Sequence, residues 1–326
     1  MKIDLFEIWI GKILNLPGGS RLSVLIYHRV LPKPDPLRRG EVDTEAFEGH
    51  MRIIKQYFSV LPLTEAIQCL HQGGLPRRAL CVTFDDGYQD NVTHALPILQ
   101  RHGLCASFFI ASGHLDGGRM WNDTVIDAIG QASGSILDLR ERELGCYDLT
   151  TLESRRQAAT ALIAQLKYSD EVNRREEIAA YILEMAGNPL LNSPMMNRSD
   201  IVTLRQAGME IGGHTRNHPI LSCLSFERAQ EEIISNKKEL EETLGEPIDL
   251  FAYPNGKPGI DFRREHVEMV RAAGYKAAVT TAWGAARQGV DLYQIPRFTP
   301  WDRTPLRFVA RLTENALRYR PVSCPL

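Results

Sequence analysis

Short apolar runs alternate with segments of helical periodicity along most of this chain, and this alternation restricts the fold more than any other feature. Runs such as LSVLIY and LCVTF are typical of buried strands. Strands regularly separated by helices predict a parallel sheet with covering helices, either open or closed into a barrel. The predicted strands are Ser23–Tyr27, Leu80–Phe84, Ala106–Ile110, Glu210–Gly212, Leu250–Ala252, Ala277–Thr280 and Gln294–Ile295. The predicted helices are Thr44–Phe58, Thr64–Gln72, Asn91–His102, Ser199–Ala207, Phe226–Leu244 and Arg263–Ala273.

The alternation stops between about residues 121 and 197, where the sequence is polar and helical without a strong strand. We expect a helical insertion on the main domain here, rather than a separate catalytic domain. Residues 1–20 carry apolar side chains at helical spacing from Leu5 to Leu16 and predict an amphipathic helix. The expected organisation is therefore this N-terminal segment and one catalytic domain, residues 21–320, that contains the insertion.

Charge and cysteine content exclude several classes of protein. A formal net charge of −2, with both signs interspersed, offers no basic field, so nucleic acid is not an expected partner. Six scattered cysteines without a CxxC pair predict free thiols rather than a disulfide framework or a cysteine zinc site. Asp4, Glu7 and Lys12 interrupt the apolar N-terminus, which predicts neither a signal peptide nor a membrane span.

Polar clusters directly follow four of the predicted strands. The carboxyl ends of parallel strands gather on one face of the sheet, and ligands bind there in such folds. The clusters are His28 in IYHRV, Asp85 and Asp86 in TFDDG, His214 and His218 in EIGGHTRNHP, and Tyr253 to Gly256 in LFAYPNG. These four strand ends define the candidate site.

The histidine pair and the carboxylate pair together supply metal ligands. The four-residue spacing of His214 and His218 brings two imidazoles onto one helical turn or tight loop. Two histidines and one aspartate leave zinc an open position for water, which frees the second aspartate for another role. Two simpler interpretations stay open: the histidines are surface-loop residues, or DDG is a solvated turn.

On these motifs the sequence resembles the polysaccharide deacetylase family, the NodB-like domains of carbohydrate esterase family 4. Thr83–Gly87 matches the family's TFDDG motif, and His214–His218, HTRNH, matches its His-Ser/Thr-x-x-His motif. The resemblance covers most of the chain outside the insertion. It implies a distorted (β/α) barrel and a divalent metal, usually zinc, with cobalt or nickel as alternatives. It also implies that Asp85 acts as the base and that Asp86 binds the metal with the two histidines.

Two departures from the family pattern concern catalytic residues. The third motif usually reads Arg-x-Pro-Tyr, but AYPNG has Ala252 and Asn255 in place of the arginine and the tyrosine. No histidine follows His266 that could serve as the family's late catalytic histidine. The Tyr-His of IYHRV resembles the circularly permuted branch of the family, which includes deacetylases of poly-N-acetylglucosamine, and implies His28 in that role.

For the missing arginine we infer Arg297 in QIPRFTP, which follows a short apolar strand and could pair with Asp85. The main-chain amide of Asn255 is the expected donor to the oxyanion, and Tyr253 beside it is assigned to the same oxyanion and substrate region. The simpler alternatives are a surface arginine, and, for His28, a buried histidine bonded to a backbone carbonyl.

The expected function is metal-dependent hydrolysis of an N-acetyl amide on a saccharide or polysaccharide, which releases acetate. One alternative is a catalytically silent barrel that binds a glycan or a protein. Another is an amide hydrolase with a non-sugar substrate, although the HExxH motif of many zinc peptidases is absent. The expected location is cytoplasmic, with the N-terminal segment packed on its own domain or in peripheral contact with the inner membrane surface.

Overall fold

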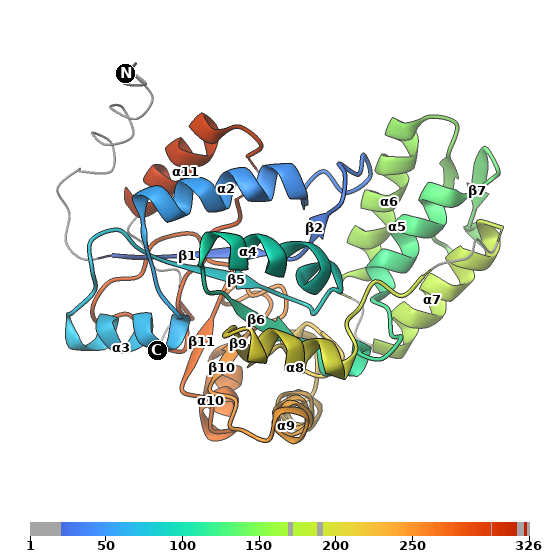
Figure 1. Ribbon diagram of the computed structural model, residues 1–326. Helices are drawn as coiled ribbons and strands as arrows, with labels where there is room; N and C mark the ends of the chain where they lie inside the picture. Colours follow the sequence, from blue (N-terminus) through green and yellow to red (C-terminus); the bar gives the residue numbers. More distant parts are fainter. Residues whose placement is uncertain (1–20, 169–171, 188–191, 301, 318–322, 325–326) are drawn as a thin grey trace, which may run out of the picture.

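The structure is a computed structural model that describes residues 21–168, 172–187, 192–300, 302–317 and 323–324 (Figure 1). Strands lie at the centre, helices cover them, and a smaller group of helices stands to one side (Figure 1). The predicted N-terminal amphipathic helix, residues 1–20, lies outside the described residues.

A 7-stranded parallel sheet forms the centre of the molecule. Six strands follow one another in the order β1-β5-β6-β9-β10-β11, and β4 pairs with the start of β5. Their bounds are β1 (Leu22–Tyr27), β4 (Ser59–Val60), β5 (Ala79–Phe84), β6 (Ser107–Ile110), β9 (Glu210–Gly213), β10 (Leu250–Ala252) and β11 (Ala277–Val279). The predicted parallel α/β architecture is confirmed.

The segment Ile295–Phe298 joins the two ends of the sheet. Val279 of β11 forms a parallel bridge with Ile295, and Leu25 of β1 forms a parallel bridge with Phe298. Main-chain hydrogen bonds accompany both bridges, because the N–H of Ile295 donates to β11 at 3.0 Å and that of Phe298 donates to β1 at 2.8 Å. The predicted last strand, Gln294–Ile295, is therefore a single bridge at Ile295, and this bridge and the one at Phe298 close the distorted (β/α) barrel.

All six predicted helices are present (Figure 1). They are α2 (Thr44–Tyr57), α3 (Leu63–Gln72), α4 (Leu96–His102), α8 (Arg198–Gln206), α9 (Phe226–Leu244) and α10 (Arg264–Ala272). Five of them pack on the outer face of the sheet, and α3 packs against the other face. The sequence analysis did not predict α11 (Pro305–Leu317), β4, or the short pair β2 (Val30–Leu31) and β3 (Val42–Asp43). The predicted helix Asn91–His102 begins with a π-helical turn, Asn91–Ala95, before α4. Among the described residues, no helix has both the length and the hydrophobicity that crossing a bilayer requires.

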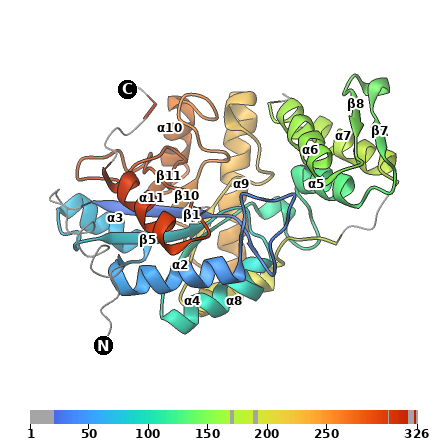
Figure 2. The same ribbon diagram turned by 90° about the horizontal axis from the view of Figure 1, so that it is seen from above.

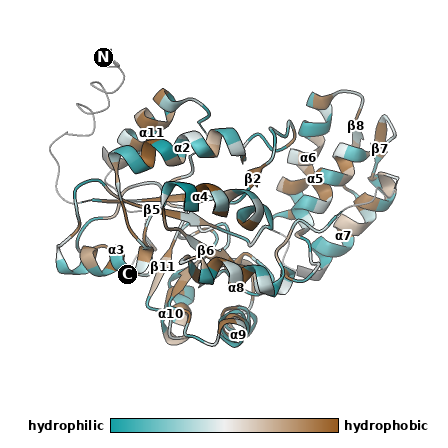
Figure 3. Ribbon diagram, in the orientation of Figure 1, coloured by the Kyte–Doolittle hydropathy of each residue, from teal (hydrophilic) through white to brown (hydrophobic). Residues whose placement is uncertain are grey.

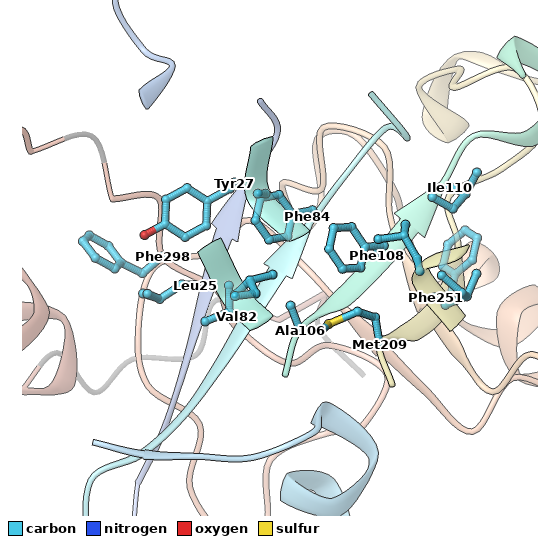
Figure 4. Close-up of a cluster of buried hydrophobic side chains, with 14 of the residues drawn as sticks. Leu25, Tyr27, Val82, Phe84, Ala106, Phe108, Ile110, Met209, Phe251 and Phe298 are labelled. Atoms are coloured by element: carbon cyan, nitrogen blue, oxygen red, sulfur yellow. The ribbon is translucent and has the colours of Figure 1, made fainter. Parts of the chain in front are cut away.

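Side chains of each strand alternate between two hydrophobic clusters, because successive residues on a strand point to opposite faces. One cluster, which includes Tyr27, Phe84, Phe108 and Phe251, packs against the covering helices (Figure 4). The other takes the alternate residues, such as Val24 of β1, and lies on the inner face of the barrel. Figure 3 shows the matching alternation of hydrophobic and hydrophilic residues along the covering helices.

The segment between β6 and α8 forms a group of helices with a hydrophobic cluster of its own (Figure 2). It contains α5 (Trp121–Gln131), α6 (Leu152–Leu166), α7 (Val172–Met185) and an antiparallel hairpin of β7 (Ile136–Asp138) and β8 (Cys146–Asp148). The hairpin corrects the expectation that this region lacks strands. Its strands are only three residues long, and Ile136 is exposed, so the sequence carries no periodic signal for them.

Candidate active site

Asp85 and Asp86 lie directly after β5, at the carboxyl end of the sheet. Asp86 has a φ of 79°, in the left-handed region, so the chain turns at the aspartate itself before Gly87 continues the turn. This conformation is unfavourable for a residue with a Cβ, and such strain persists only where neighbouring contacts hold it. The turn explains how two adjacent carboxylates reach one site with different surroundings.

Asp86, His214 and His218 come together in one cluster, in which one potential ligand atom from each residue lies within 4.8 Å of the others. The Asp86 Oδ1 atom lies 3.4 Å from His214 Nε2 and 3.4 Å from His218 Nε2. The sequence places these residues far apart, and β5 and the end of β9 bring them together. The expected ligand set is therefore assembled in the structure.

The cluster fits a divalent metal. Asp86 Oδ1 is buried and has no hydrogen-bond partner, which is costly for a carboxylate oxygen unless a cation binds it. Two ligand atoms about 2.1 Å from a tetrahedral zinc ion are about 3.4 Å apart, which is the separation found here. Aspartate and neutral imidazole are also the ligand types that zinc accepts.

The hydrogen bond of His214 and the pKa of His218 suit this role. His214 Nδ1 lies 2.7 Å from the carbonyl oxygen of Ala252, so Nδ1–H donates to that oxygen and Nε2 keeps its lone pair for the cluster. Burial lowers the pKa of His218 to about 3, although Asp86 opposes the shift, so the imidazole is neutral at physiological pH. Ala252 replaces the family's arginine, yet its main chain orients a histidine of the cluster.

Arg297 and Asp85 form a buried, bidentate ion pair. Each guanidinium NH group donates to a different carboxylate oxygen at 2.7 Å. Arg297 also donates to the Thr83 hydroxyl at 3.1 Å and to the Thr280 carbonyl at 3.0 Å, and its side chain has no exposed surface. Burial alone would raise the pKa of Asp85, but Arg297 and His214 outweigh it, and the net pKa lies below its ordinary value. The structure thus pairs Arg297 with Asp85, as the sequence analysis expects.

His28 lies just beyond β1, on the neighbouring strand end, with its side chain half-buried. The side-chain amide of Asn91 donates to the His28 carbonyl at 2.9 Å and fixes the main chain there. Burial alone would lower the pKa of His28, but Asp86, Glu41 and Asp85 outweigh it, and the net pKa is raised. Both aspartates therefore act electrostatically on this imidazole.

Tyr253 and Asn255 differ in what they offer to a substrate. The Tyr253 ring has no exposed surface and stacks on Phe262 with centroids 3.8 Å apart, on the helix side of the barrel. A substrate contact by this ring does not fit the structure, because Tyr253, the residue after β10, lies with Phe251 in the cluster against the helices. Asn255 is half-buried and has a φ of 58°, and its proposed role as an oxyanion donor stays a prediction.

Three polar residues at the site were missed by the sequence analysis. The sequence predicts Asn91 only as the first residue of a helix, but its side chain also donates to the His28 carbonyl. His114, which follows β6, is buried. Burial lowers the pKa of its imidazole, and Asp86 acts against this shift. Asn236 of α9 is fully buried and its Oδ1 accepts the main-chain N–H of His214 at 3.0 Å. The sequence signal for Asn236 was weak, because a single asparagine in a charged helix resembles a surface residue.

The fold and the site together define an α/β barrel with a cluster of three residues at the carboxyl ends of its strands that could hold a metal ion. A family model described as polysaccharide deacetylase matches residues 72–133 and 149–278. The chain therefore belongs to the polysaccharide deacetylase family, and it is a hydrolase of carbon–nitrogen bonds other than peptide bonds. The unmatched stretch between the two ranges contains the β7–β8 hairpin.

Relatives of known sequence and structure agree with this family. The Bacillus subtilis protein YxkH, which is named as a polysaccharide deacetylase, is 23% identical over 280 residues. The match covers 85% of this chain and 71% of YxkH. The poly-β-1,6-N-acetyl-D-glucosamine N-deacetylase of Staphylococcus aureus is 21% identical over 215 residues, which cover 62% of this chain and 74% of that protein.

Among solved structures, IcaB from Ammonifex degensii has a TM-score of 0.58 and 20% identity, and the match covers 91% of this chain and 97% of IcaB. The Streptococcus pyogenes deacetylase PplD, in complex with acetate, also has a TM-score of 0.58, with 18% identity, and the match covers 86% of this chain and 93% of PplD. At these identities the likeness shows the fold alone. A relation to the circularly permuted branch stays a prediction.

Proposed function

We propose that this protein removes N-acetyl groups from a saccharide or polysaccharide by metal-assisted hydrolysis, with acetate as one product. The contrast between two adjacent carboxylates carries the proposal. Asp86 Oδ1 is buried without a hydrogen-bond partner beside two histidines, whereas Asp85 is held ionised by Arg297. A metal ligand next to a proton acceptor is the arrangement that metal-assisted hydrolysis requires.

Asp86, His214 and His218 would hold the metal, and zinc is the ion we propose, with cobalt or nickel as substitutes. When bound there, the ion supplies Lewis acidity, which polarises a carbonyl group and lowers the pKa of water to about 7. The two imidazoles suit this role because a main-chain carbonyl orients His214 and burial lowers the pKa of His218.

Asp85 is the proposed general base. Its pKa lies below the ordinary value, so the carboxylate is ionised throughout the neutral range and can accept the proton of the attacking water. The bidentate contact with Arg297 fixes the carboxylate plane, and its His214-facing oxygen lies 3.8 Å from the imidazole Nε2. The base therefore lies directly beside the ligand cluster.

His28 is the proposed general acid. Its raised pKa keeps a proton available near neutral pH, and this proton would pass to the nitrogen of the departing amine. The main-chain N–H of Asn255 would donate to the oxyanion as the carbonyl carbon becomes tetrahedral. Acid and base would then act from the ends of two neighbouring strands, β1 and β5.

The names of the relatives guide the choice of substrate. Because the Staphylococcus aureus relative is named for poly-β-1,6-N-acetyl-D-glucosamine, acetylated β-1,6-glucosamine oligomers are the first substrates to test. The protein is stripped with a chelator, zinc, cobalt or nickel is restored, and acetate and free amine are measured together. Equal release of both in the metal-restored protein, and none with chelator, is the expected result; no release with any metal would count against these substrates.

The variant Asp85→Asn separates an enzyme from a silent binding barrel. It keeps the size of the side chain but removes the proton acceptor, so hydrolysis should fall by about 10²–10⁴-fold while oligomer binding persists. Asp138→Asn, in the exposed hairpin of the insertion, is the matched control and should retain full activity. A wild-type protein that binds the oligomer but releases no acetate would favour the silent barrel, and release from simple acetamides would favour a non-sugar amide hydrolase.

A further inference from the structure

Helix α9 presents three polar side chains to the loop that carries His214 and His218. Glu232, Asn236 and Glu239 stand at positions i, i+4 and i+7, which lie on one face of a helix. Residues on such a face normally contact solvent or apolar neighbours, but these three form hydrogen bonds with the metal-ligand loop or with the turn beside it.

Asn236 binds the start of the loop. Its Oδ1 accepts the main-chain N–H of His214 at 3.0 Å, and its Nδ2 donates to the Ile110 carbonyl and to the Ser112 hydroxyl, both at 2.9 Å. The side chain is fully buried. Gly213 makes this approach possible, because a Cβ at that position would lie 2.5 Å from Asn236 Oδ1. The amide thus ties the end of β9 to the end of β6.

Glu232 and Glu239 bind the middle of the loop. The two carboxylate oxygens of Glu232 accept the main-chain and side-chain N–H groups of Asn217, both at 2.7 Å. Glu239 accepts from Arg216 Nε at 2.7 Å and, with its other oxygen, from the Ser112 hydroxyl at 2.6 Å. Together with Asn236, these contacts link α9 to the loop from its first histidine to the residue before its second.

The loop needs such support because its backbone is strained. Thr215 has a φ of 60° and His218 a φ of 52°, both in the left-handed region and neither at a glycine. Such conformations are unfavourable for residues with a Cβ and persist only where surrounding contacts determine them. The strained residues place both imidazoles beside Asp86, so contacts that hold the strain also hold the ligand geometry.

We propose that Glu232, Asn236 and Glu239 form a polar clamp on α9 that positions the metal-binding loop, and that metal affinity depends on it. The clamp residues are positioning residues, since none of them belongs to the ligand cluster. The inference rests on the metal site of the proposed function but not on the identity of the acetylated substrate.

The test measures zinc affinity by competition with a chromogenic chelator, and the visible absorption spectrum of the cobalt-loaded protein. Glu232→Ala and Asn236→Ala should each weaken zinc binding about 10–100-fold, as loss of the groups that orient ligands does. The cobalt spectrum should change in both variants, because the ligand field follows the ligand positions. Glu232→Gln keeps one acceptor oxygen for Asn217 and should recover part of the affinity.

Glu242→Ala is the control, because Glu242 is on the exposed side of α9 and pairs with Lys238 at 3.8 Å. Thermal unfolding of the metal-free proteins identifies any variant that does not fold, and Glu232→Gln, the milder change, then carries the test. Folded variants with wild-type zinc affinity and an unchanged cobalt spectrum would overturn the clamp and leave the proposed function intact. A wild-type protein that binds neither zinc nor cobalt would overturn both.

Discussion

Arg297 and Asp85, 212 residues apart in the sequence, form two parallel hydrogen bonds of 2.7 Å inside the barrel. Arg297 lies on the segment that joins β11 to β1, so the same four residues close the barrel and hold the proposed base. In this chain the guanidinium comes from the closing segment of the barrel, whereas the third-motif position holds Ala252, whose carbonyl binds His214.

Arg297→Ala should lower both stability and activity. It leaves Asp85 buried without its partner, and loss of one member of a buried pair costs about 3–5 kcal/mol of unfolding free energy, measurable by urea denaturation. Burial then raises the pKa of Asp85, so activity should fall at a higher pH on the acidic side than in the wild type. Arg307→Ala, at an exposed position on α11, should change neither property. If the activity of Arg297→Ala fell at the same acidic pH as that of the wild type, the pair would have no role in catalysis.

The Arg297–Asp85 pair also predicts how the unfolding free energy changes in acid. The pKa of Asp85 is lower in the folded protein than its ordinary value of 3.8, so the stabilising contribution is complete above pH 3.8. It disappears as the pH falls through the lower folded pKa. The wild-type protein should therefore lose more unfolding free energy than Arg297→Ala when the pH is lowered below 3.8, in urea titrations at fixed ionic strength.

Asp86→Asn, His214→Gln and His218→Gln should each reduce the metal content of the purified protein after zinc is restored. Removal of a ligand should weaken binding more than the about 10–100-fold loss that accompanies changes around a ligand. The measurement is elemental analysis after dialysis, with Asp138→Asn as the control. Wild-type metal content in all three variants would show that the cluster is not the binding site.

Much of this site could be predicted from the sequence, because strand ends in a parallel sheet meet on one face and the chemistry lies at those ends. TFDDG and HTRNH each follow a short apolar run, and β5 and β9 end where these runs end. The alternation along LFAY also carried information on Tyr253 that the sequence analysis did not use. Because Phe251 packs against the helices, Tyr253, two residues later, must do the same.

Other features had no local signal. The closure of the barrel rests on two single bridges, at Ile295 and Phe298, and one-residue pairings leave no periodic pattern. Asn236 lies in a helix rich in charged residues, and its burial depends on Gly213 of a distant strand. The turn at Asp86 depends on the contacts that hold a left-handed backbone, which sequence alone does not supply.

His28→Gln should keep metal binding and slow turnover by about 10²–10⁴-fold, as loss of a general acid does. The pKa of His28 lies above the ordinary 6.5, so wild-type activity should decline only as the pH rises through that higher value. The variant should lack this basic limb in plots of kcat/KM against pH. His71→Gln, exposed at the end of α3, is the control. A variant with wild-type turnover would favour the alternative from the sequence analysis, in which His28 is a structural histidine bonded to a backbone carbonyl.

His50 predicts a second dependence of stability on pH, outside the active site. The ring is buried and stacks on Phe308, with ring centroids 4.0 Å apart. Its Nε2–H donates to the Asp302 carbonyl at 2.6 Å, and its Nδ1 accepts from the Tyr27 hydroxyl at 3.0 Å. Both nitrogens are therefore satisfied in the neutral form, and burial lowers the pKa to about 4.

Because the folded pKa of His50 lies below the ordinary 6.5, the unfolded state binds more protons between about pH 4 and 6.5. The contribution of neutral His50 is complete above pH 6.5 and is lost as the pH falls towards 4, by about 3 kcal/mol in all. His50→Gln has no titrating group there, so the difference in unfolding free energy between wild type and variant should shrink across this window. A constant difference from pH 7 to pH 4 would mean that folding does not shift the pKa of His50.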